Sequence, residues 1–151
     1  MKSKPAFNVR EYEEKDFLAV AELWKQTGIN TPGRGDTAAT IANTLRHGGR
    51  LLVLEEKTSG SVVGTSWLTS DGRRLYLHHF AVVPDFQGRG LSKPLLHESL
   101  KIARETGLQL KLEVHRNNKR AVNLYKNVGF QRLGDYDVYI IRDLQEIKFE
   151  E

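Results

Sequence analysis

The sequence predicts one domain of mixed α/β architecture, and three observations lead to this expectation. The chain has 151 residues, which is enough for one well-formed core and short for two. Several short segments alternate apolar and polar side chains, as half-buried strands do, while others place apolar residues three and four apart, as helices do. A strand at 75–83 leads through a glycine-rich turn into a helix and then into another strand, which makes a β-α-β unit.

The first part of the chain is expected to contain one strand and two helices. Residues 7–12 alternate apolar and polar side chains and predict the strand. Residues 16–28 have helical spacing, and Asp16 is a suitable capping residue. A second helix is expected to begin at Asp36 or Thr37. Between the helices, the composition of residues 30–36 predicts a loop, which would either shape a substrate pocket or serve as a plain connector.

The rest of the chain alternates strands and helices. Turn residues at Ser59-Gly60 and Asp71-Gly72 separate three alternating segments and predict a β-meander. The following helix must begin close to Gly90, because Pro94 lacks an N–H and is tolerated only in the first turn. In chain order, the expected elements are strands at 51–54, 62–68 and 75–83, a helix at 91–107, a strand at 108–114, a helix from Asn117 or Asn118 to Gly129, and strands at 130–133 and 136–141.

Composition restricts the possible chemistry. The chain has no cysteine, which excludes disulfides, thiolate nucleophiles and thiolate metal sites. None of its five histidines has metal-ligand spacing, so no metal is expected. No apolar run approaches the ~20 residues needed to span a bilayer, and the first residues lack a signal-peptide core, so we expect a cytoplasmic protein with no membrane attachment. The net charge of +4 permits a mild attraction to polyanions.

Two closely spaced glycines, Gly88 and Gly90, stand between an apolar strand and a helix. Glycines at such a junction let the backbone approach a ligand and leave N–H groups unpaired at the positive end of the helix dipole. This layout predicts a cradle for a phosphate or pyrophosphate. A Walker A loop is excluded, because the required Gly-Lys-Ser/Thr ending is missing. A dinucleotide-binding fingerprint stays open at this point: Lys93 replaces its third glycine, but Glu113 lies about where its acidic residue belongs.

Two motifs resemble those of the GNAT superfamily of N-acetyltransferases. Gln87-Gly88-Arg89-Gly90-Leu91-Ser92 is similar to the signature Gln/Arg-x-x-Gly-x-Gly/Ala, with Ser92 in place of the usual Gly or Ala. Residues 112–130 are similar to the pattern Leu-Glu-Val-x-x-x-Asn-x-x-Ala-x-x-Leu-Tyr-x-x-x-Gly-Phe, found especially in ribosomal-protein-alanine N-acetyltransferases and their relatives. The resemblance implies a mostly antiparallel central sheet of six or seven strands flanked by helices. It also implies an acetyl-CoA cleft between two parallel strands that splay apart, here the strands that end near Val83 and Val114.

By this resemblance, the chain binds acetyl-CoA as the acetyl donor. Main-chain amides from 88–93 would wrap the pyrophosphate, and the backbone at 80–82 would pair with the pantetheine arm like an added strand. The side chains of Arg89 and Lys93 are available to the phosphates, or are exposed cations at a helix start. The implied cofactor-binding residues are Phe80, Ala81, Val82, Gln87, Gly88, Arg89, Gly90, Leu91, Ser92, Lys93 and Asn118.

The resemblance also implies two catalytic residues. Tyr125 would lie beside the sulfur of the cofactor and act as general acid, because a phenol can protonate a departing thiolate; alternatively it packs beneath Phe130. Glu113 would act as general base through water, or would simply face solvent. His78 and His79 are rival bases, of which strand alternation should turn only one toward any cleft, and His115 is a third.

The expected function is direct transfer of an acetyl group to a primary amine, either a protein N-terminus or a small-molecule amine. The alternative is a non-catalytic acyl-CoA sensor that keeps the cradle without turnover. A nucleic-acid binder using the basic residues between 116 and 132 is disfavoured, because the cluster has little aromatic interleaving. A monomer and a homodimer are both compatible with the sequence.

Overall fold

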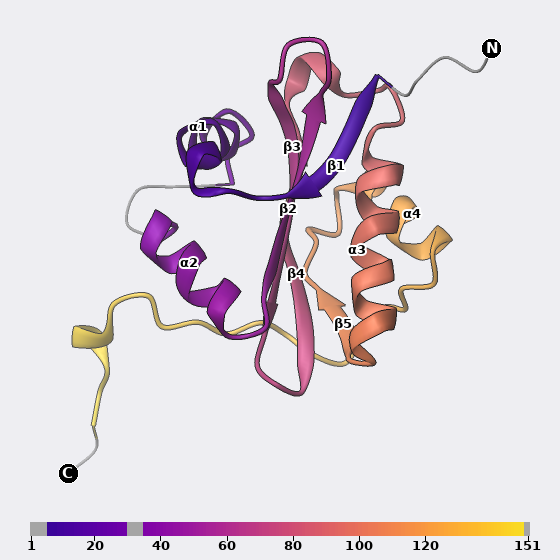
Figure 1. Ribbon diagram of the computed structural model, residues 1–151. Coiled ribbons are helices and arrows are strands. Elements are labelled where there is room, and N and C mark those ends of the chain that lie inside the picture. Colours follow the sequence, from indigo (N-terminus) through magenta and orange to yellow (C-terminus); the bar gives the residue numbers. More distant parts are fainter. Residues whose placement is uncertain (1–5, 30–34, 150–151) are drawn as a thin grey trace. The chain divides into compact units, whose positions relative to one another are not determined.

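The computed structural model of the chain describes residues 6–29 and 35–149 (Figure 1). Most of the predicted loop at 30–36 therefore lies outside the described residues. Contacts divide the chain into two compact units, the first reaching Val114 and the second beginning at His115. No helix in the described parts of the chain is long and apolar enough to cross a membrane.

A five-stranded sheet forms the centre of the first unit, with the strands in the order of the sequence. The first four strands pair antiparallel and the last pair, β4 and β5, is parallel. Figure 1 shows α1 (Phe17–Gln26) and α2 (Ala38–Arg46) on one face and α3 (Ser92–Thr106) on the other. The strands are β1 (Phe7–Glu11), β2 (Arg50–Glu56), β3 (Val62–Ser70), β4 (Arg74–Val82) and β5 (Gln109–Leu112). The prediction of a mostly antiparallel α/β fold is confirmed.

The core under α1 and α2 is built around two tryptophans. The indoles of Trp24 and Trp67 stack with their centroids 5.4 Å apart, and both side chains are buried. Aliphatic side chains of α1, α2 and β2 complete this cluster, including Val20, Ile41 and Leu51. The apolar faces that the helical and strand periodicities predict therefore pack together in one layer between the helices and the sheet.

The beginnings of α1 and α2 are stabilised in different ways. Thr37 caps α2, since its Oγ1 accepts a hydrogen bond from the Thr40 amide at 3.1 Å. The prediction that Asp16 caps α1 is wrong, because its side chain makes no capping hydrogen bond to that helix. Arg10 holds the carboxylate instead, with Nη1 and Nη2 donating at 2.8 and 2.9 Å, and this pairing lowers the pKa of Asp16.

On the opposite face, α3 packs through Leu95, Leu96 and Ile102. Pro94 is its third residue, so the predicted start near Gly90 is confirmed. A buried pair of hydroxyls, Ser66 and Ser99, joins β3 to this helix at 2.6 Å.

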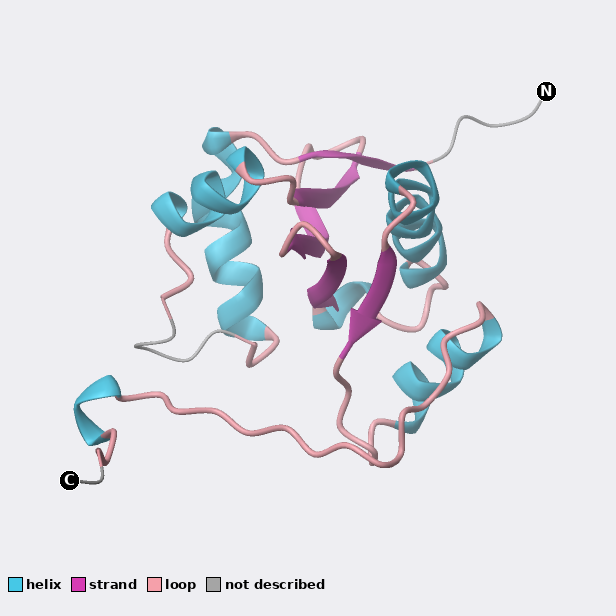
Figure 2. Ribbon diagram, turned by 90° about the horizontal axis from the view of Figure 1, so that it is seen from below, coloured by secondary structure: helices cyan, strands magenta, loops and turns pink. Residues whose placement is uncertain are grey.

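The second unit contains α4 (Lys119–Asn127) and the short 3-10 helix η3 (Leu144–Glu146). Figure 2 shows the chain between them without regular structure. The predicted strands at 130–133 and 136–141 are therefore wrong, and the described residues form five strands in place of the expected six or seven. Alternation alone does not make a strand, because its amides and carbonyls need a neighbouring strand to pair with.

Candidate active site

The parallel strands β4 and β5 pair over only part of their length. Their register runs from Arg74 opposite Gln109 to Leu77 opposite Leu112. β4 then continues from His78 to Val82, where the described residues include no β5 partner for it. The two strands end at Val82 and Leu112, close to the expected ends near Val83 and Val114. The backbone predicted to meet the pantetheine arm, at residues 80–82, belongs to this continuing segment.

Gln87 ties the glycine turn to the end of β4. Its Nε2 donates to the carbonyl oxygen of Val82 at 2.8 Å, so this carbonyl already has a partner within the protein. Val82 and Ala81 lie opposite Gly64 and Thr65 of β3. At Gly64 a Cβ atom would lie 3.1 Å from the oxygen of Ala81, so the two strands approach closely here because β3 has a glycine.

The glycine turn presents a run of backbone amides ahead of α3. Gly88 and Gly90 have φ angles of 79° and 74°, in the left-handed region that glycine adopts without strain. Within the described parts of the chain, the amides of residues 88–92 have no hydrogen-bond acceptor, while the Lys93 amide donates to the oxygen of Gly90 at 3.4 Å. Unpaired amides at a helix start are the arrangement that binds phosphate groups.

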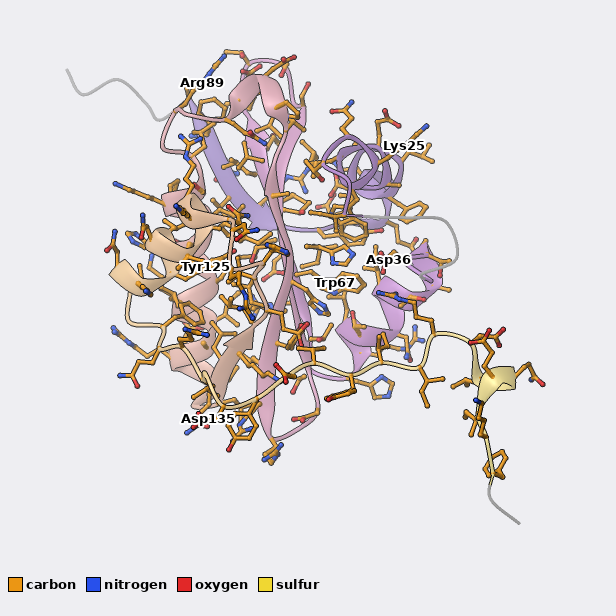
Figure 3. All side chains as sticks on the ribbon, turned by 180° about the vertical axis from the view of Figure 1, so that it is seen from behind. Lys25, Asp36, Trp67, Arg89, Tyr125 and Asp135 are labelled. Carbon is orange, nitrogen blue, oxygen red and sulfur yellow. The ribbon has the colours of Figure 1, made fainter. Side chains whose placement is uncertain are left out.

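The Arg89 side chain is already engaged. Its Nη2 donates to the oxygen of Asp85 at 3.1 Å, and its guanidinium lies 4.7 Å from the ring centroid of Phe86. Figure 3 shows Arg89 at the turn, at one end of the sheet. The backbone of the turn, rather than this side chain, is therefore the part that is free to hold an anion.

β4 contains a bulge beside the point where it leaves β5. Thr65 lies opposite Ala81 and Trp67 lies opposite His78, so two residues of β4, His79 and Phe80, face a single residue of β3. His79 has a φ of 48°, a conformation that costs a non-glycine residue about 1–3 kcal/mol. Two hydrogen bonds hold it: Thr65 Oγ1 donates to the His79 oxygen at 2.7 Å and accepts from Trp24 Nε1 at 2.9 Å.

The bulge turns both histidines toward Trp67. The ring of His78 stacks on Trp67 and the ring of His79 meets it edge-on, each with a centroid distance of 5.2 Å. The expectation that strand alternation turns only one of them toward a cleft is therefore wrong, because the extra residue of the bulge breaks the alternation.

The two histidines have different partners. His79 Nε2 lies 2.8 Å from Asp36 Oδ2, and the side chains are 16% and 12% exposed, so neither is sealed from solvent. His78 Nε2 is hydrogen-bonded to Thr69 Oγ1 at 2.8 Å. Burial lowers the pKa of His78 to about 4, which leaves that ring neutral and a poor proton acceptor at pH 7. The sequence did not mark Asp36 as a site residue, since nothing in it links Asp36 to a histidine so distant in the chain.

Glu113 follows the last residue of β5 and is exposed. Burial, and then a hydrogen bond with the Glu113 carboxylate, raise the pKa of Tyr76. Glu113 thus lies close to the side chain of Tyr76, which stands two residues before His78 in β4. Its predicted role as a base is compatible with this exposure.

In the second unit, α4 carries the two remaining predicted residues. Asn118 Oδ1 accepts from the Ala121 amide at 3.3 Å, so Asn118 caps this helix as its position predicts. Tyr125 is 9% exposed, and burial raises its pKa to about 12. Its ring packs edge-on against Phe130 with centroids 5.6 Å apart. His115 is exposed, and its Nδ1 accepts from the Asn117 amide.

A family model of the acetyltransferase (GNAT) family matches residues 11–130. The chain belongs to the GNAT family. The solved structures that share its fold include the following three. A putative acetyltransferase from Salmonella typhimurium with its cofactor acetyl-CoA has 23% identity and a TM-score of 0.70, covering 84% of this chain and 80% of that one. A glucosamine-6-phosphate N-acetyltransferase from Arabidopsis thaliana has 18% identity and a TM-score of 0.70, covering 93% and 99%. AAC(6')-Iy, in complex with the bisubstrate analogue CoA-S-monomethyl-acetylneamine, has 17% identity and a TM-score of 0.72, covering 91% and 99%.

These matches define the GNAT family but not a subgroup. None of them supports the narrower resemblance to ribosomal-protein-alanine N-acetyltransferases. Across residues 6–29 and 35–149, no three histidine, aspartate or glutamate side chains gather in a way that would hold a metal ion. A hollow of about 260 Å³ at the β3–β4 turn, lined in part by Asp71, Arg73 and Lys111, contains none of the predicted site residues.

Proposed function

We propose that this GNAT protein transfers an acetyl group from acetyl-CoA directly to a primary amine. The observation that carries the proposal is the run of unpaired amides at residues 88–92, which leads into the first residue of α3 and follows the segment where β4 leaves β5. Membership of the acetyltransferase family supports it, as does the fold shared with a protein solved with acetyl-CoA. The alternative of a non-catalytic sensor is not favoured by these relatives.

Acetyl-CoA fits the residues that would hold it. The amides of residues 88–92, arranged by two left-handed glycines, offer several donors to a pyrophosphate. The segment at 80–82 offers backbone to the amides of the pantetheine arm, with the Val82 carbonyl reserved for Gln87. Bound there, acetyl-CoA supplies an activated thioester, so a covalent enzyme intermediate is unnecessary.

Tyr125 is our candidate for the group that stabilises the departing sulfur. With a pKa of about 12 it stays protonated at neutral pH and keeps an O–H to donate. A thiol has an ordinary pKa of about 8.5, so full proton transfer from this phenol to a thiolate is unfavourable. We therefore propose a hydrogen bond from Tyr125 to the developing thiolate. Asn118, which begins the same helix, is the candidate for a further cofactor contact.

The attacking amine must lose a proton, and two groups compete for it. Glu113 has the position of the motif glutamate and is exposed to solvent, which suits transfer through a water molecule. His79 is the rival with a carboxylate partner. The acceptor is either a protein N-terminus or a small amine, since related folds include enzymes named for glucosamine-6-phosphate and a complex with an acetylneamine analogue. Neither nucleic acid nor a membrane has a part in this function.

The test is a panel of amines scored for release of CoA from acetyl-CoA. Glucosamine-6-phosphate, neamine, a peptide with a free N-terminal alanine and a lysine peptide with a blocked N-terminus cover the chemical classes. Binding of CoA by calorimetry is measured alongside. Turnover of any member supports the function. Absence of CoA binding would falsify it, and CoA binding without turnover of any amine would favour the sensor instead.

A further inference from the structure

Asp36 and His79 form a hydrogen-bonded acid–imidazole pair beside the segment where β4 leaves β5. We propose that this pair, rather than Glu113, takes the proton of the attacking amine, with His79 as the base and Asp36 as its positioning residue. The inference rests on the proposed acetyl transfer and names the group that performs one of its steps.

The hydrogen bond fixes which nitrogen acts. A carboxylate only accepts hydrogen bonds, so in the neutral ring His79 Nε2 carries the hydrogen that it donates to Asp36 Oδ2 at 2.8 Å. The lone pair is then on Nδ1, and among the described residues Nδ1 has no hydrogen-bond partner. A ring oriented by a carboxylate at one nitrogen and open at the other is the arrangement of a general base.

The bulge gives this ring its position. An unbroken strand would turn the side chains of residues 78 and 79 to opposite faces, but the left-handed backbone at His79 brings its ring to the face covered by α1 and α2. Asp36 reaches it from the segment just before α2. Figure 3 labels Asp36 beside this helix. His79 directly precedes the residues proposed to meet the pantetheine arm, so a thioester held at 80–82 would end near this ring.

Among the described residues, one carboxylate and one further imidazole lie against His79. The groups packed against it from α1 and β3 are Trp24, Trp67 and Thr65, none of which titrates. Its own strand contributes His78, whose burial keeps it neutral, and the segment before α2 contributes the Asp36 carboxylate.

The step balances without another reagent. The amine nitrogen attacks the carbonyl carbon of the thioester, so a C–N bond forms and the C–S bond breaks. The proton of the nitrogen goes to Nδ1 of His79 and from there to solvent. The sulfur leaves as a thiolate and takes its proton from solvent.

The experiment compares His79→Gly with the native protein, using acetyl-CoA and the panel amine that the native protein turns over fastest. Glycine suits the φ of 48° and leaves room for a free imidazole molecule. We expect kcat to fall about 100-fold or more, with CoA affinity unchanged and the rate partly restored by added imidazole. His97→Gln, on the exposed face of α3, is the matched histidine control and keeps native activity.

Asp36→Asn separates positioning from packing. It should lower kcat by about 10-fold or more and change the acid limb of the pH profile, because the imidazole loses the carboxylate that fixes its tautomer. If His79→Gly keeps the native rate and pH profile, the assignment of His79 as the base is wrong while the proposed function stands. The assignment is also wrong if the acid limb is lost in Glu113→Gln but not in His79→Gly. Absence of native turnover with every amine overturns the proposed function together with it.

Discussion

Replacing Thr65 with valine should destabilise the protein far more than the loss of one hydroxyl suggests. Thr65 is completely buried, and its Oγ1 joins the Trp24 indole N–H to the carbonyl of His79. Valine keeps the volume and the branching, so no cavity opens. It leaves one donor and one acceptor unpaired, each of which costs about 1–3 kcal/mol when buried. The free energy of unfolding should therefore fall by about 2–6 kcal/mol, a large fraction of the ~5–15 kcal/mol typical of a domain.

Urea unfolding followed by circular dichroism measures this change, and Thr65→Ser is its control. Serine keeps the hydroxyl and removes one methyl group, which costs about 1 kcal/mol. Valine should therefore cost at least twice as much as serine. If Thr65→Val unfolds within about 0.5 kcal/mol of the native protein, the hydroxyl does not hold the bulge and the reasoning fails.

Three further predictions test the site and its surroundings. Tyr125→Phe should lower kcat about 10-fold or more without changing CoA affinity, and equal rates would leave Tyr125 a packing residue beside Phe130. Gly90→Ala should weaken CoA binding measured by calorimetry, because a left-handed alanine costs about 1–2 kcal/mol and shifts the turn; Gly60→Ala, with a similar φ of 72° and equally open surroundings, should cost the same stability but keep the affinity. The pKa of His78, lowered to about 4, means that the unfolded chain binds this proton first, so stability should decline as pH falls from about 6.5 toward 4. His78→Gln should decline less over that range in urea titrations, and an identical slope would contradict the shift.

The sequence predicted the elements whose signals are local. Helix α3 was expected to start close to Gly90 because Pro94 restricts it, and Thr37 was one of two expected caps for α2. The three central strands followed from alternation interrupted by turn residues. These features depend on neighbours in the chain, so one sequence contains the information for them.

The features that the sequence did not reveal depend on distant contacts. A left-handed histidine has no signature of its own, since Thr65 and Trp24 stabilise the bulge from other elements. Asp36 could not be assigned to the site for the same reason. For the segment at 136–141, the local pattern predicted an element that is not formed. The segment alternates like a strand but has no ladder partner among the described residues.

The tryptophan pair has a practical consequence for following the protein in solution. The chain has two tryptophans, and their indole centroids lie 4.6 and 5.2 Å from that of His79. All indole fluorescence of the molecule therefore originates beside this one imidazole. A change in its protonation, or a compound arriving next to it, should alter the emission of the unlabelled protein, so the fold contains its own optical reporter.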